Sequence, residues 1–285
     1  MKYRLLSFCM AVLLLISMIS VPRIEAANST ETFKDSADTK IVKLLEALGL
    51  MEIDSETGFF WDEMPVKRSE LAKIICKMFN ISETKDASPH FTDVSDYDRA
   101  YIETAIRNGY MSGYDNEKFG PDDYVTNIQL IKTFVTALGG DAAAQSQGGY
   151  PGGYITIGNM LGLLKGKAVA NENISRRIDV ANIIYTALHA DVLEIAGSVG
   201  NNINYKTVDG YTFLTEKRNI YRVKGIISQN EATSLNRDNG LGEGNVKIGT
   251  EIHCDDKHLT DDYWGCNVEC YVEIPKGDSV GKILY

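Results

Sequence analysis

Three short segments of the sequence carry polar and charged side chains at the spacing of a helix start. They are Lys67-Arg68-Ser69-Glu70, Thr126-Asn127-Ile128-Gln129 and Arg176-Arg177-Ile178-Asp179. A Thr at the N-cap and a Gln three residues later form a capping box, which satisfies exposed backbone N–H groups. The next side chain after the cap projects from a helix N-terminus, where the N–H groups and the helix dipole favour an anion. An arginine there is suited to bidentate recognition of a carboxylate, so the chemistry these segments indicate is anion binding.

A simpler interpretation of the same segments stays open. Arg68, Arg177 and their acidic neighbours are also typical of a solvated helix start with local ion pairs. Such surface pairs contribute only about 0–1 kcal/mol to stability. The recurrence of the segment three times favours the binding interpretation.

Each segment opens the second helix of a recurring helix–turn–helix pattern. In the first copy, apolar spacing predicts helices in "KIVKLLEALGLMEI" and "KRSELAKIICKMFNI". The third copy has its helices in "GGYPGGYITIGNMLGLLKG" and "RRIDVANIIYTALHADVL", after a linker, "GGDAAAQSQGGYPGG", that is poor in core-forming residues. We therefore divide this part of the chain into copies at residues 40–85, 86–141 and 142–196.

From Gly197 the pattern changes to alternating β-branched and aromatic residues. The predicted strands lie in "YTFLT", "NIYRVKGIIS", "EATSL", "NVKIGTEIHC", "NVECYVEIP" and "VGKILY". Turns rich in Asn, Asp and Gly separate them. Residues 197–285 are therefore expected to form a β-rich C-terminal domain.

The N-terminus predicts export. A short basic stretch precedes an apolar run from Leu5 to Val21, and small residues follow at Ala26 and Ala27. These features are typical of a secretory signal peptide over residues 1–27, with an uncleaved membrane anchor as the alternative. The polar residues 28–39 are expected to form a flexible leader.

Charge and cysteine usage narrow the class of protein further. The formal net charge is −10, and removal of residues 1–27 with their net +2 makes it −12. An acidic protein disfavours nucleic acid and anionic membrane as bulk partners, so an anionic ligand needs a local cationic site.

Whether two of Cys254, Cys266 and Cys270 form a disulfide stays open at this point. No catalytic motif pairs a nucleophile with a base, and the His253–His258 loop fits no zinc pattern, so we expect no enzyme, no metal and no cofactor.

The second copy resembles the S-layer homology repeat. The resemblance rests on residues 91–94, Gly109-Tyr110, Ser112-Gly113-Tyr114 and residues 119–122, which occur in that order before Val125-Thr126. It extends, less closely, over residues 40–196. It implies a multidomain fold: a mainly α, pseudo-threefold prism of helix–turn–helix repeats, followed here by the mainly β domain.

The resemblance also implies which residues bind. Arg68 and Arg177 match the family's carboxylate-binding arginines, supported by Glu70 and Asp179 at the helix starts, with Arg176 as the alternative to Arg177. Asn127 replaces the arginine in the second copy, so that groove is expected to bind weakly. The groove walls are expected to contain Gly109, Ser112, Gly113, Tyr114, Lys165 and Gly166.

The function implied is non-catalytic anchoring at the bacterial cell surface. The expected partner is a pyruvylated secondary polysaccharide attached to peptidoglycan in a Gram-positive-type cell wall, with other S-layer subunits as further partners. Nucleic acid, and membrane after signal cleavage, are not expected as partners. Two alternatives remain: a tethered hydrolase that acts on the cell wall, and a self-assembling surface protein without affinity for glycan.

Overall fold

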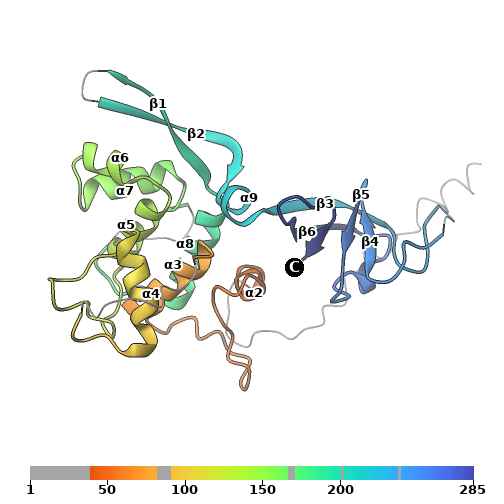
Figure 1. The fold of residues 1–285 in the computed structure, drawn as a ribbon, viewed down its shortest axis with the longest axis horizontal. Coiled ribbons are helices and arrows are strands. Elements are labelled where there is room, and N and C mark those ends of the chain that lie inside the picture. Colours follow the sequence, from red (N-terminus) through yellow and green to blue (C-terminus); the bar gives the residue numbers. More distant parts are fainter. Residues whose placement is uncertain (1–38, 82–90, 166–170, 200–201, 237–238) are drawn as a thin grey trace, which may run out of the picture. The chain divides into compact units, whose positions relative to one another are not determined.

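The computed structural model describes residues 39–81, 91–165, 171–199, 202–236 and 239–285. The predicted signal peptide and nearly all of the predicted leader lie outside the described residues. Helices occupy the first part of the described chain and strands most of the second (Figure 1), as the sequence predicts at this coarse level. The helices are α2 (Thr39–Ala47), α3 (Arg68–Met78), α4 (Asp96–Arg107), α5 (Asn127–Ala137), α6 (Asp141–Ser146), α7 (Gly152–Met160), α8 (Arg177–Leu188) and α9 (Phe213–Arg218).

The three segments at which the sequence predicts helix starts begin α3, α5 and α8. Arg68, Asn127 and Arg177 each stand at the first helical position. In α5, Thr126 and Gln129 form the predicted capping box, in which the Gln129 Oε1 accepts the backbone N–H of Thr126 at 3.2 Å. The three side chains are therefore presented from equivalent positions on three helices.

A closed ring of backbone hydrogen bonds joins the residues that precede these helix starts. The N–H of Val66 donates to the carbonyl of Ser175 at 3.2 Å, that of Ser175 to Val125 at 2.8 Å, and that of Val125 to Val66 at 3.0 Å. Single β-bridges flank each contact, for example Lys67 with Tyr124. The ring holds three chain segments in one fixed arrangement, although the first and the last of them are more than 100 residues apart in the sequence.

The first N–H group of each helix bonds to a turn from another part of the sequence. Arg68 donates to the carbonyl of Asp123 at 2.9 Å, Asn127 to that of Asn173 at 2.9 Å, and Arg177 to that of Met64 at 2.8 Å. Helix N-termini leave such groups without an intrahelical partner, so each contact satisfies a donor that would otherwise need water. As a consequence, each helix start lies against the turn of a different predicted copy.

One hydrophobic core unites the helices. It includes Leu45 of α2, Ile75 of α3, Ile102 of α4, Phe134 of α5 and Ile184 of α8, each less than 1 % exposed. These residues occupy the apolar faces that the helical periodicity predicts. The core fixes the helices that carry the candidate site.

The strands form a hairpin and a small barrel. The hairpin pairs β1 (Asp191–Val199) with β2 (Asn202–Thr212) in antiparallel fashion. The barrel has the order β3-β4-β5-β7-β6 and closes because β6 pairs with β3. Its strands are β3 (Ile220–Gln229), β4 (Asn245–Ile248), β5 (Glu251–Cys254), β6 (Asn267–Glu273) and β7 (Gly281–Ile283), and its core includes Ile227, Val246, Ile248, Val272 and Ile283.

Several local predictions were wrong. The segment predicted as a linker contains α6, because Ala143 and Ala144 are fully buried in the core. "YTFLT" is not one strand: β2 ends at Thr212, whose hydroxyl caps α9 by accepting the N–H of Thr215. "EATSL" forms no strand, because Asn230 Oδ1 accepts the N–H groups of Ala232 and Thr233 and bends the chain into a turn. The helix predicted to extend to Leu193 ends at Leu188, where β1 soon follows.

Three kinds of feature are not found in the described part of the chain, and the membrane anchor considered for residues 1–27 lies outside it. Its four cysteines, Cys76, Cys254, Cys266 and Cys270, are all free thiols, so the disulfide left open is not formed. No group of three or more His, Cys, Asp or Glu side chains there is arranged to hold a metal ion. Among these residues there is also no helix with the length and apolar character needed to cross a membrane.

Candidate functional site

The guanidinium of Arg68 contacts the turn that precedes α5 through both hydrogen bonds and aromatic rings. Its Nε donates to the carbonyl of Phe119 at 3.0 Å and its Nη2 to that of Ser112 at 2.7 Å. The guanidinium also lies over two aromatic rings, with its central carbon 4.7 Å from the Tyr114 centroid and 4.5 Å from the Phe119 centroid. Cation–π contacts of this kind stabilise a guanidinium that has lost water. We call Arg68, Ser112, Tyr114 and Phe119 the Arg68 site.

The charge of Arg68 is buried without an ion pair. The residue is only 7 % exposed, and the described acidic side chains include none within ion-pair distance of it. Burial lowers the pKa of Arg68, and the charges of Tyr114, Asp123 and Asp93 offset that effect only in part. A buried cation whose direct partners are neutral is a favourable place for an anion.

Arg177 repeats this geometry at the start of α8. Its Nε donates to the carbonyl of Phe60 at 2.9 Å, its Nη2 to that of Glu52 at 2.9 Å, and its guanidinium lies 4.8 Å from the Phe60 ring. Arg176 instead binds Glu63 and Asp179, which raise its pKa, Asp179 having the larger effect. Arg177, and not Arg176, therefore matches Arg68.

Arg177 differs from Arg68 in having a carboxylate partner. Its Nη1 lies 2.6 Å from Oε1 of Glu70 on α3, and the side chains are 16 % and 34 % exposed. Glu70 thus pairs with Arg177 and not with Arg68, the arginine two residues before it in the sequence. Asp179 likewise pairs with Arg176 rather than with Arg177. Each of the two acidic residues thus forms an ion pair, Glu70 with Arg177 and Asp179 with Arg176.

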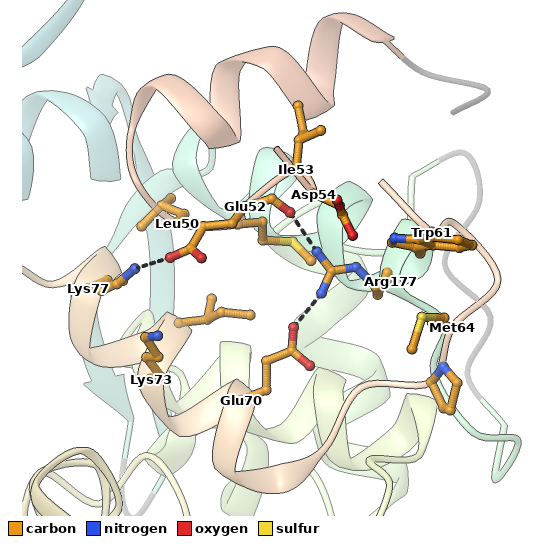
Figure 2. A pocket seen from close by; sticks show the side chains of 13 residues that line it. Leu50, Glu52, Ile53, Asp54, Trp61, Met64, Glu70, Lys73, Lys77 and Arg177 are labelled. Carbon is orange, nitrogen blue, oxygen red and sulfur yellow. Dashed lines mark hydrogen bonds and ion pairs between the residues drawn. The ribbon is translucent and has the colours of Figure 1, made fainter. Parts of the chain in front are cut away.

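A pocket of about 410 Å³ opens beside Arg177. Figure 2 shows Glu70 below the guanidinium, Trp61 and Met64 on one side of it, and Glu52 with Lys77 on the other. Lys77 pairs with Glu52 at 3.3 Å, and Lys73 and Asp54 also line the space. We call this space the Arg177 pocket. Its volume falls within the range of sites for small ligands, about 300–1,000 Å³.

Trp61 is held in the Arg177 pocket by an unusual backbone conformation. Its φ is +62°, in the left-handed region that bulky residues rarely adopt, and its side chain is 41 % exposed. In the turn beside Arg68, the residue after the buried Phe is Gly120, with φ of +73°. Trp61 thus stands at a backbone position that suits glycine and that bulky residues rarely adopt.

Asn127, which takes the arginine's position on α5, has both ends of its side chain bonded. Its Nδ2 donates to Oδ1 of Asn171 at 2.9 Å, and its Oδ1 accepts from the Ser175 hydroxyl at 2.8 Å. Ser175 is completely buried. Asn127 therefore ties the start of α5 to the neighbouring turn and supplies no cation.

The other residues expected at the groove walls have varied positions. Gly109 follows the end of α4 with φ of +75°, and Gly113 packs so closely that a Cβ would lie 2.5 Å from the Phe91 ring. Lys165 is exposed next to Gly162, and Gly166 lies outside the described residues. The sequence analysis missed Trp61, Glu52, Asp54 and Lys77 as pocket residues. Trp61 stands where the similar turn beside Arg68 has Gly120. This difference between the two turns was the signal that could have identified Trp61 from the sequence.

Comparison with known proteins identifies the stretch that builds the Arg68 site. The family model described as the S-layer homology domain matches residues 90–130. This chain contains an S-layer homology domain. The match includes the turn that holds Arg68 and the start of α5, while Arg68 itself lies before it.

Two relatives resemble a longer part of the chain. The middle cell wall protein of Brevibacillus brevis is 24 % identical over an aligned length of 285 residues. The alignment covers 90 % of this chain and 26 % of that protein. The surface layer protein of Brevibacillus choshinensis is 26 % identical over 181 residues, which cover 61 % of this chain and 16 % of that protein. The chain thus spans about a quarter or less of the length of these relatives, and its S-layer homology domain is the part with a family match.

Proposed function

We propose that the chain is a non-catalytic anchor that attaches a surface-layer protein to the cell wall by binding a polysaccharide linked to peptidoglycan. The single observation that carries the proposal is that the matched S-layer homology domain contains the turn that cradles Arg68. The names of the two relatives, a cell wall protein and a surface layer protein, support a location at the cell surface. Export by a signal peptide at residues 1–27 is part of the same proposal.

In this proposal Arg68 recognises an anionic group of the polysaccharide, such as the carboxylate of a pyruvylated sugar. Its two bonds to carbonyls leave further N–H donors of the guanidinium for a ligand. Tyr114 is 58 % exposed and covers the guanidinium, so it would contact the sugar that carries the carboxylate. Ser112 contributes its carbonyl to this site, Gly113 packs closely beside it, and Gly109 follows the helix that leads to it.

We further propose that residues 40–85, 86–141 and 142–196 are three repeats in a pseudo-threefold prism. The cyclic hydrogen bonds among Val66, Val125 and Ser175 support this arrangement, because a threefold axis relates the members of such a ring. The positions of Arg68, Asn127 and Arg177 at the first residue of three helices support it as well. Lys165 and Asp179 would then lie along the groove that Asn127 faces.

The test is a pull-down of the purified chain on isolated cell walls, before and after chemical release of the wall polysaccharide. The proposal predicts that release abolishes binding and that Arg68→Ala weakens it by about tenfold or more, the loss expected for a charged hydrogen-bonding partner. Undiminished binding after release would contradict the proposal and favour attachment through other surface subunits. Release of soluble fragments from peptidoglycan by the chain would instead indicate a hydrolase.

A further inference from the structure

A histidine is buried in the C-terminal barrel without a hydrogen bond to its ring. His253 of β5 is 2 % exposed, and neither its Nδ1 nor its Nε2 has a hydrogen-bond partner among the described residues. The preceding residue, Ile252, is 41 % exposed, as the alternation of a strand requires when His253 points into the barrel. Buried polar groups are nearly always hydrogen-bonded, so a bare imidazole at this place needs an explanation.

We propose that His253 makes the barrel an acid-sensitive element, which is stable while the imidazole is neutral and is weakened when acid supplies a proton. A neutral ring can be buried at a modest cost even when its donor and acceptor are unbonded. A charged ring in the same place would need a partner for its charge. The inference goes beyond the proposed function, because it concerns the barrel and not the residues proposed to bind the cell wall.

The two carboxylates nearest to His253 in the sequence are poorly placed to stabilise a charged ring. The Oε2 of Glu251 lies 3.8 Å from Nε2 of His253, beyond hydrogen-bond distance, and its side chain is 66 % exposed, so water screens the attraction. The carboxylate of Asp255 accepts the N–H groups of Leu259 and Thr260 at 2.8 Å each and the Thr260 hydroxyl at 2.6 Å. Asp255 is therefore bonded to its own loop.

The neighbouring strands surround His253 with uncharged groups. Its register partners are Val246 on β4 and Gly281 on β7, and both are buried. The titratable groups on the core side include Cys270 of β6, whose pKa burial raises to about 11, and Tyr263 of the 3-10 helix η1 (Asp261–Tyr263). By alternation, the charged residues of the other barrel strands lie on the face opposite the core. They are Arg222 and Lys224 of β3, Lys247 of β4, Glu269 and Glu273 of β6, and Lys282 of β7.

This environment determines the direction in which pH changes stability. Burial lowers the pKa of His253 below its ordinary value of 6.5, and the charge of Glu251 offsets that effect only in part. The unfolded chain therefore binds a proton at a pH at which the folded barrel does not. Stability should be constant well above pH 6.5 and should fall as the pH drops below it, by up to about tenfold in the unfolding equilibrium constant per pH unit.

His189, at the end of α8, is a second buried histidine and has to be separated from His253. Its Nδ1 donates to the carbonyl of Tyr185 at 2.7 Å, and its Nε2 lies 2.8 Å from the hydroxyl of Tyr271. Burial lowers the pKa of His189 as well, so it adds to a loss of stability in acid. Only the part of that loss that disappears with His253 therefore tests the inference.

Unfolding in urea tests the inference, with Trp264 as the reporter. Trp264 packs against the barrel core, and Trp61 is the other tryptophan of the chain, so Trp61→Phe leaves an emitter specific to the barrel. The full-length chain with this change would be unfolded at pH 7.5 and at pH 5.5. In the same background, His253→Phe replaces the imidazole by an apolar ring, and His258→Gln removes an exposed histidine of the following loop as the control.

We expect His253→Phe to make the rise in the unfolding equilibrium constant between pH 7.5 and pH 5.5 at least about fivefold smaller than in the parent chain. His258→Gln should leave the rise within about twofold of the parent value. An equal rise with and without His253 would overturn the inference.

An NMR titration of the His253 ring in the folded parent chain decides the matter even when His253→Phe does not fold. Proton uptake with a midpoint at about pH 6.5 or above would overturn the inference. A lower midpoint, or no uptake before the barrel unfolds, would support it. Neither result bears on wall binding, so failure here is distinct from failure of the proposed function.

Discussion

The Arg68 site and the Arg177 pocket are built on the same plan but differ in charge. In both, an arginine at the first position of a helix donates from Nε to the carbonyl of a buried phenylalanine and packs over that ring. Arg68 is nearly buried and bonds only to neutral groups, whereas Arg177 borders an open pocket and pairs with Glu70. One acidic side chain from a neighbouring helix thus makes one of two otherwise equivalent arginines a member of an ion pair.

The largest difference in stability is expected from truncating the two arginines. Arg68→Ala leaves the buried carbonyl of Phe119 and the partly buried carbonyl of Ser112 without a donor, so it should lower the free energy of unfolding by about 2–4 kcal/mol. Arg177→Ala should lower it by about 1–2 kcal/mol, because Glu70 is partly exposed and regains water. Denaturant unfolding measures both, with Lys118→Ala on the same exposed turn as the control. An equal or larger loss for Arg177→Ala would remove the distinction between the sites.

A double-mutant cycle isolates the ion pair that separates the sites. Arg177→Ala combined with Glu70→Ala should give a coupling energy of about 1 kcal/mol, as expected for a partly exposed pair with a short contact. The corresponding cycle of Arg68→Ala with Gln129→Ala should give a coupling near zero. Similar couplings in the two cycles would mean that Glu70 does not account for the difference.

Replacing Trp61 should separate stability from binding. Trp61→Gly relieves the left-handed backbone but removes the ring that packs 4.9 Å from Phe59, so the free energy of unfolding should change by less than about 1 kcal/mol. Retention on cell walls should nevertheless fall. Thermal unfolding and the retention assay check the two effects separately. A large loss of stability would assign Trp61 to the core and not to the ligand.

The smallest effect on binding is expected at Asn127. Its side chain bonds to Asn171 and Ser175 and presents no cation, so Asn127→Ala should change wall binding by less than about twofold. The cell-wall pull-down measures this directly alongside Arg68→Ala. A loss as large as that of Arg68→Ala would show that the third groove also contributes.

The sequence predicted the helix starts and most barrel strands because local signals determine them. The capping box of Thr126 and Gln129 and the alternation in "NIYRVKGIIS" act over a few residues. It could not predict α6, since burial of Ala143 and Ala144 depends on distant packing, nor α9, where the Thr212 cap prevails over β propensity.

The candidate site was predictable only in part. Arg68 and Arg177 follow from their positions at helix starts, but their partners do not. Glu70 lies 107 residues from Arg177 in sequence, and the ring of hydrogen bonds through Val66, Val125 and Ser175 brings them together. Glu70 stands two residues from Arg68 in the sequence, and only the three-dimensional arrangement reveals that it pairs with Arg177.

The most direct test of the account is wall binding by Gln129→Glu. Glutamate can replace glutamine in a capping box, so α5 should stay intact while a negative charge is placed at the position that Glu70 holds beside Arg177. Asn116→Asp adds the same charge on the exposed turn and is the control. The account predicts that Gln129→Glu weakens binding to walls by about tenfold or more and that Asn116→Asp has little effect. Unchanged binding by Gln129→Glu would contradict the claim that Arg68 binds the wall polysaccharide as a cation without an acidic partner.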